Sequence, residues 1–257
     1  MSHDGPDAVA DPRGEAEAAI LAAMAADLSM LAALHDREVT PDLITQLKLR
    51  AFPDSLLLPP SASLMRSGAV VFQDALRRLR EPYVPAQLDE LAADYAAIYL
   101  THAYQASPCE SVWTDPEGLA LQASTFRLRE RYRSHGLTVE NWRQRSEDHL
   151  VVQLHFISLL LERLGERALR EVTAFMDEHL LRWLPQFAAR VVGRCATQFY
   201  AGAALLTAGY CDQMRDVLAE MLGEPRPDPA SVSLPHPRDA HAEATPPAYV
   251  PGAAPSW

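Results

Sequence analysis

Apolar residues recur along most of this chain at the three- and four-residue spacing of an α-helix. Between Leu150 and Leu164 they follow one another at intervals of four, three, four and three, and others fill much of the remaining circumference. A helix that is apolar nearly all round is typical of the centre of a core. The sequence contains no alternating strand pattern of useful length and no Asn-Gly hairpin. The pattern therefore predicts an all-α fold.

Proline and capping residues set the expected ends of the other helices. Thr40-Pro41 and Asp115-Pro116 each place an N-cap residue before a proline at the first helical position. Ser146 suits an N-cap, and Gly136 suits the position just after a helix. Helices are expected over about residues 15–37, 41–49, 63–80, 86–105, 116–135, 147–164, 166–182, 186–208 and 211–222. This predicts a single globular helical domain of about nine to eleven helices, in one body or in two lobes.

The two ends of the chain differ in composition from this domain. Residues 223–257 contain nine prolines and few large apolar groups, so burial there cannot offset the entropy of ordering. Residues 1–14 are acidic and lack the apolar region of a secretory signal. We therefore expect disordered segments over residues 1–14 and 223–257, with the helical domain over residues 15–222.

The net charge of −11 limits the classes of partner. Each predicted terminal segment carries −2, which leaves −7 on the helical domain. An acidic domain is unsuited to binding the phosphates of a nucleic acid and favours a cationic partner. The three cysteines lie far apart without a C-x-x-C pair, and no uninterrupted apolar run approaches the ~18 residues of a membrane span. We expect a cytoplasmic protein with no stable membrane insertion.

Cys109 and the Asp148-His149 pair are the candidates for chemistry. A nucleophilic Cys109 would need a base and an orienting group, and the stretch Ser-Pro-Cys-Glu instead has the form of a capping box that starts a helix. Asp148 and His149 could act as an acid–base pair. Ser146, Glu147 and Asp148 also suit the first turn of a helix, where negative charge is favoured.

Sequence motifs for metals and cofactors are missing. There is no H-E-x-x-H, no Walker A loop and no G-x-G-x-x-G, and the six-residue separation of His149 and His155 places them on different faces of a helix. We expect no catalytic residue, no metal ion and no cofactor.

Four stretches, in this order, resemble the TorD/DmsD family of molybdoenzyme-specific chaperones. They are SPCESVW (107–113), RYRSHGL (131–137), SEDHLVVQLHFISLLLERL (146–164) and EHLLRWLPQFAARVVGRCATQFYAGAALLTAG (178–209). The resemblance covers roughly residues 15–220. The family often has proline where Glu147 stands, tyrosine where Cys109 stands, and acids where Gln153 and His155 stand.

The resemblance implies an all-helical cytoplasmic chaperone that is not an enzyme. Members of this family bind a molybdenum-containing oxidoreductase precursor, especially its twin-arginine signal peptide, and delay export until the cofactor is inserted. An alternative is an assembly chaperone of the NarJ type for an enzyme that is not exported. A less favoured alternative is an all-α enzyme that uses Asp148 and His149. The chain is expected as a monomer or a homodimer.

The resemblance also indicates a signal-peptide site. Its six predicted residues are Asp148, His149, Glu147, Ser111, Trp113 and Tyr104. The carboxylates of Asp148 and Glu147 would pair with the arginines of the peptide. His149 would orient Asp148 or donate a hydrogen bond to the peptide backbone. Trp113 would supply an apolar wall, and Ser111 would fix its turn.

Overall fold

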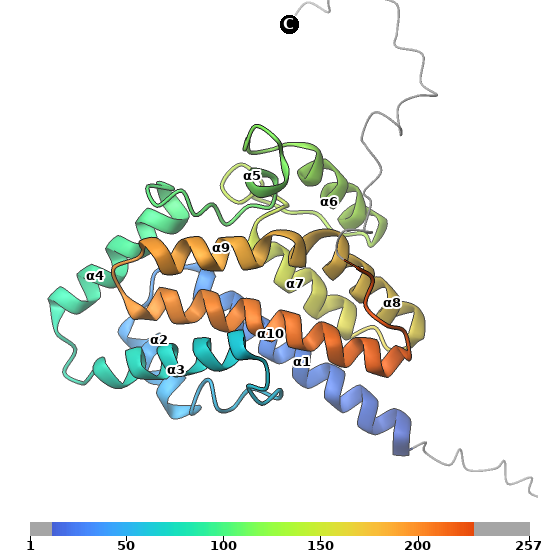
Figure 1. Ribbon diagram of the computed structural model, residues 1–257, viewed down its shortest axis with the longest axis horizontal. Helices are drawn as coiled ribbons and strands as arrows, with labels where there is room; N and C mark the ends of the chain where they lie inside the picture. The colour runs from blue at the N-terminus through green and yellow to red at the C-terminus, as the bar shows by residue number, and fades with distance from the viewer. Residues whose placement is uncertain (1–11, 229–257) are drawn as a thin grey trace, which may run out of the picture.

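The computed structural model describes residues 12–228 of the chain, and these residues form ten α-helices and two π-helical turns (Figure 1). The α-helices are α1 (Pro12–Asp36), α2 (Pro41–Leu49), α3 (Ser63–Arg78), α4 (Pro85–Tyr95), α5 (Ser111–Thr114), α6 (Ala123–Ser134), α7 (Leu150–Leu161), α8 (Glu166–Phe175), α9 (Leu181–Arg194) and α10 (Gln198–Leu222). The π-helical turns are η1 (Ala96–Leu100) and η2 (Met176–Leu180). No strand occurs among the described residues, which confirms the predicted all-α fold.

The close packing of α3 against α10 depends on small residues. A Cβ atom on Gly202 of α10 would lie 2.6 Å from the backbone nitrogen of Phe72, and one on Gly209 would lie 2.5 Å from the Cα of Met65. From the other side, a Cβ on Gly68 of α3 would lie 2.4 Å from the backbone nitrogen of Leu206. Glycine allows two backbones to approach this closely because it has no Cβ atom.

Helix α1 is long and apolar enough to cross a membrane by length and composition alone. Its apolar residues nevertheless belong to the core, because Leu21, Met24 and Leu28 are buried and the helix packs along α7. Ser158 of α7 donates a hydrogen bond to the carbonyl oxygen of Ala25 at 2.9 Å. The apolar character of α1 is therefore accounted for by packing inside the fold.

Several predicted helix boundaries are wrong. Helix α6 begins at Ala123, because the Asp115 carboxylate accepts backbone hydrogen bonds from residues 117 and 119 and closes a turn instead of capping a helix. Helix α7 begins at Leu150, with His149 as its N-cap in place of Ser146. Pro185 does not separate two helices, because it follows the first turn of α9, directly after a π-helical turn that already interrupts the regular hydrogen-bond pattern.

The break expected near residue 210 instead lies between α9 and α10. The carboxylate of Asp94, on α4, accepts hydrogen bonds from the backbone nitrogens of Ala196 at 3.0 Å and Thr197 at 2.6 Å. A side chain from a distant helix thus satisfies backbone donors at the start of α10.

After Gly223 ends α10 with a left-handed conformation, the next residues lie against the helical body. Glu224 pairs with Arg170 at 2.8 Å, and the Arg226 guanidinium pairs with Asp212 and Asp216, each at 2.8 Å. The remainder of the predicted tail and residues 1–11, where disorder is also predicted, lie outside the described residues.

Candidate functional site

Residues 107–113 and 146–150, which the sequence marks as candidates, lie directly against each other. Cys109 and His149 form an isolated antiparallel bridge. On either side of it, the backbone nitrogen of Leu150 donates to the Pro108 carbonyl at 2.8 Å, and that of Glu110 donates to the Asp148 carbonyl at 3.0 Å. The two segments are therefore held together by their backbones.

Asp148 reinforces this junction from inside. Its side chain is fully buried, and its Oδ2 accepts a hydrogen bond from the backbone nitrogen of Ser111 at 2.9 Å. Its Oδ1 accepts a hydrogen bond from the Ser146 hydroxyl at 2.5 Å. A buried carboxylate is costly unless it is hydrogen-bonded, and here both oxygens have donors. Asp148 therefore fixes the position of the α5 turn relative to the start of α7.

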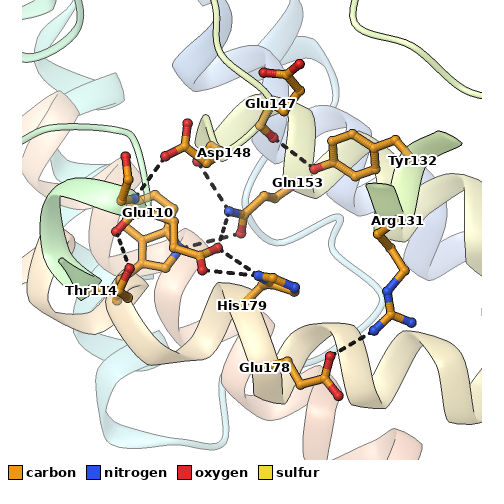
Figure 2. A network of polar contacts seen from close by, with 11 residues as sticks. Glu110, Thr114, Arg131, Tyr132, Glu147, Asp148, Gln153, Glu178 and His179 are labelled. Atoms are coloured by element: carbon orange, nitrogen blue, oxygen red, sulfur yellow. Dashed lines mark hydrogen bonds and ion pairs between the residues drawn. The ribbon is translucent and has the colours of Figure 1, made fainter. Parts of the chain in front are cut away.

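Beneath Asp148, a buried polar network joins α5, α7 and η2 (Figure 2). The carboxylate of Glu110 accepts a hydrogen bond from Gln153 Nε2 at 2.9 Å, and both its oxygens lie 3.1 Å from Nδ1 of His179. Gln153 Nε2 also donates to the Asp148 carbonyl at 3.2 Å, and its Oε1 accepts from the indole nitrogen of Trp183 at 3.4 Å. The predicted capping box is thus wrong, because the Glu110 side chain points into the core.

His149 is a neutral N-cap. Its Nδ1 accepts a hydrogen bond from the backbone nitrogen of Val151 at 3.2 Å, so the proton of the neutral ring is on Nε2. Burial lowers the pKa of His149 to about 3, and the nearby Arg145 guanidinium adds to this effect. A neutral ring agrees with the position of His149 at a helix N-terminus, where a positive charge is disfavoured.

Glu147 differs from Asp148 because its carboxylate is only half satisfied. Its Oε1 accepts a hydrogen bond from Arg129 Nε at 2.6 Å, whereas its Oε2 is buried without a hydrogen-bond partner. The Tyr132 hydroxyl donates to the Glu147 backbone carbonyl at 3.0 Å. Glu147 also lines a cavity of about 290 Å³ with Arg129, Tyr132 and Trp142. It is the one predicted acid that faces a recess.

Cys109 lacks the surroundings of a nucleophile. Burial raises the pKa of its thiol to about 12, with the Asp148 carboxylate adding to the effect. Its sulfur lies 3.5 Å from the Ser146 hydroxyl, which cannot serve as a base. A reactive cysteine needs thiolate character, so Cys109 is a structural residue of the bridge to His149.

Comparison with known proteins confirms the resemblance to the TorD/DmsD family. The model of a family described as nitrate reductase delta subunit matches residues 65–189. The chaperone protein TorD of Vibrio cholerae serotype O1 is 36% identical over 160 residues, which cover 59% of this chain and 71% of that relative. TorD of Vibrio vulnificus is 31% identical over 193 residues (70% and 87%), and TorD of Psychrobacter sp. strain PRwf-1 is 31% identical over 214 residues (77% and 93%). The chain belongs to the TorD family of chaperones.

TorD proteins are named as chaperones, and the alternative of an enzyme that uses Asp148 and His149 is wrong for this chain. The geometry gives the physical reason. The Asp148 carboxylate binds Ser111 and Ser146, whereas the imidazole of His149 caps α7, so the two side chains serve different partners. Residues 12–228 also contain no group of three or more His, Cys, Asp or Glu side chains that could hold a metal ion.

The two predicted aromatic residues of this TorD-family chain lie in different surroundings. Trp113 is half-buried beside the junction, where its indole nitrogen donates to the Ser107 carbonyl at 2.8 Å and the Arg190 guanidinium lies 5.4 Å from its ring centroid. Tyr104 instead donates its hydroxyl hydrogen bond to Asp94 at 2.8 Å, beside the start of α10. The structure therefore brings Trp113, Ser111 and residues 147–149 together, and Tyr104 binds a separate carboxylate.

Glu110, Gln153 and His179 were not predicted to form one network. A signal was present in the resemblance, since His179 and Trp183 lie in one of the four stretches. Glu110 was hidden because its spacing from Ser107 fits a capping box equally well.

Proposed function

We propose that this chain is a system-specific chaperone that binds a molybdoenzyme precursor, through its twin-arginine signal peptide, its apo-enzyme or both. In this role it assists insertion of the cofactor and prevents premature export. Membership of the TorD family carries the proposal, and the acidic helical domain supports it because negative charge attracts a cationic leader. We place the chaperone in the cytoplasm because the leader must be bound before export. We propose that it is a monomer or a homodimer.

Within this proposal the predicted site residues take different roles. Glu147 is the direct partner for a peptide arginine, because it faces a recess and one of its oxygens has no partner. Asp148 and Ser111 position the junction, since both are fully buried. His149 presents an Nε2–H donor to a peptide backbone, and Trp113 adds an apolar wall. Tyr104 extends the surface toward the start of α10.

The first test is a pull-down with the tagged protein from its native organism, with the bound chains identified by mass spectrometry. A molybdoenzyme catalytic subunit that retains its twin-arginine leader is the expected result. A molybdoenzyme without such a leader would favour the alternative of a NarJ-type chaperone. Recovery of no oxidoreductase by a folded bait would overturn the proposal.

A second test measures binding of a twin-arginine peptide directly. Glu147→Gln combined with Asp148→Asn is expected to weaken binding about 10- to 100-fold, because the first change removes a charged hydrogen bond to the peptide and the second loosens the junction that positions it. The matched control is Asp89→Asn combined with Glu90→Gln, which removes two negative charges from exposed positions on α4. Unchanged affinity of the folded double variant would contradict the site assignment, and an equal loss in the control would indicate a non-specific charge effect.

A further inference from the structure

The cavity beside Glu147 is already lined by an arginine side chain of the chain itself. Arg129 of α6 donates from Nε to Glu147 Oε1 at 2.6 Å. Its guanidinium carbon lies 5.4 Å from the ring centroids of both Phe126 and Trp142. Both distances are in the range of cation–π attraction. Two aromatic rings and a carboxylate thus surround one guanidinium group, and we call Phe126, Trp142 and Glu147 the aromatic–acid cage.

The bond between Arg129 and Glu147 leaves part of the cage unused. A guanidinium and a carboxylate bind best through two parallel hydrogen bonds. Here only Nε of Arg129 reaches the carboxylate, and Glu147 Oε2 remains buried without a partner. The cavity of about 290 Å³ next to it is walled by Tyr132, Trp142 and apolar side chains. A guanidinium that enters from this cavity and displaces Arg129 can use both oxygens.

Helix α6 is attached to the body in a way that permits such a displacement. It is a polar helix with four arginines in seven residues, and Arg131 pairs with Glu178 on the body at 2.8 Å (Figure 2). The described residues contain eight buried side-chain polar atoms without a hydrogen-bond partner, and five of them belong to α6 or to residues beside it. These five are on Ser111, Ser124, Thr125, Arg127 and Glu147. These five atoms have no hydrogen bond that a shift of the Arg129 side chain would break.

We infer that the aromatic–acid cage is a guanidinium-binding site that Arg129 occupies in the free chaperone and that an arginine of the client peptide occupies in the complex. The inference rests on the proposed function, because it requires an arginine-containing client. It adds to that function a free state in which the chain's own Arg129 occupies the peptide's arginine site. Arg129 competes with the client, so a peptide without arginine cannot open the site, and lysine is a poorer ligand because it lacks the planar two-donor fork.

The test is calorimetric titration with a synthetic peptide that carries two consecutive arginines before an apolar stretch, compared with the same peptide carrying two lysines. Wild-type protein is expected to bind the arginine peptide at least about 10-fold more tightly. Trp142→Ala, at a side chain that is 41% exposed, is expected to weaken arginine-peptide binding about two- to fivefold. Arg129→Ala removes the competitor and is expected to strengthen arginine-peptide binding about threefold or more.

Arg77→Ala is the matched control for Arg129→Ala. Arg77 is 73% exposed on α3, a helix that lies on the opposite side of the molecule from α6 in Figure 1, and removal of its side chain changes the net charge by the same amount. Tightening by Arg129→Ala but not by Arg77→Ala supports displacement at the cage, whereas equal tightening by both overturns it. If Arg129→Ala fails to fold, the exposed Trp142→Ala variant still decides the question.

The failure of this inference is distinguishable from failure of the proposed function. If wild-type protein prefers the arginine peptide but neither Trp142→Ala nor Arg129→Ala changes its affinity, the cage is wrong and signal-peptide binding stands. If wild-type protein binds neither peptide, both the cage and signal-peptide binding are overturned, and the pull-down still decides whether an apo-enzyme is the client.

Discussion

His149 couples the start of α7 to pH. In the folded chain its ring is buried, accepts the Val151 hydrogen bond through Nδ1 and has its pKa lowered to about 3 by burial. In the unfolded chain the same ring regains an ordinary pKa of about 6.5. The unfolded state therefore binds more protons between these two pKa values. The contribution of His149 to the free energy of unfolding is full above about pH 6.5 and is lost as the pH falls toward 3.

The size of this effect follows from the two pKa values. At pH 5 the unfolded ring is almost fully protonated and the folded ring is neutral, so integration from pH 7 to pH 5 gives a loss of about 2 kcal/mol from this residue. Asparagine at position 149 can still accept the helix-capping hydrogen bond but does not titrate. His149→Asn is therefore expected to lose about 2 kcal/mol less stability than wild type over this pH interval.

Urea denaturation at pH 7 and pH 5, followed by circular dichroism, measures this difference. His149→Ala serves as a control for capping, because it removes the cap at both pH values and should cost about 0.5–2 kcal/mol at pH 7, yet show the same reduced pH dependence as His149→Asn. If wild type and His149→Asn lose the same free energy between pH 7 and pH 5, the ring is not held neutral in the folded state.

Two further substitutions test the packing and the buried network. Gly202→Ala would place a methyl group 2.6 Å from the backbone of Phe72 and is expected to destabilise the fold by at least about 1–3 kcal/mol, as measured by thermal melts. In the same melts the control Gly193→Ala, at a position with open space around it, should be neutral or slightly stabilising. Glu110→Ala leaves the buried His179 ring without its acceptor and should cost about 3–5 kcal/mol in urea denaturation, against about 1–3 kcal/mol for Glu110→Gln, which keeps one acceptor oxygen. Equal costs for the two Glu110 variants would show that His179 does not depend on this carboxylate.

The helical class and several helix ends could be predicted because their causes are local. Apolar spacing identified α7 as a core helix, and nine of the twelve α7 residues are buried. Thr40-Pro41 starts α2 as expected, with the Thr40 hydroxyl accepting the backbone hydrogen bond of Leu43 at 3.2 Å. In these cases the residues that decide the structure are within one helical turn of one another.

The remaining boundaries could not be predicted because their causes are distant in the chain. The start of α10 depends on Asp94, about a hundred residues earlier, and the spacing of apolar residues from 186 to 208 gives no sign of that break. The same holds for the site. Its sequence segments could be located, but the hydrogen bonds that the carboxylates of Asp148 and Glu147 accept come from Ser111 and Arg129. Only the tertiary structure brings these donors close.

The difference between these two acids affects how binding data on this family member should be interpreted. Loss of peptide binding in an Asp148 variant does not identify Asp148 as a contact, because its carboxylate holds the Ser111 turn in place and its loss would displace neighbouring groups. Glu147 can be separated from such indirect effects. Its Oε2 has no partner to lose, and in Glu147→Gln the amide oxygen can still accept the Arg129 hydrogen bond. The substitution therefore removes charge at the recess while the Tyr132 bond to the backbone of residue 147 is retained. A variant that keeps its unfolding free energy but loses arginine binding would therefore identify a contact at Glu147, whereas parallel losses of stability and binding would indicate a positioning role.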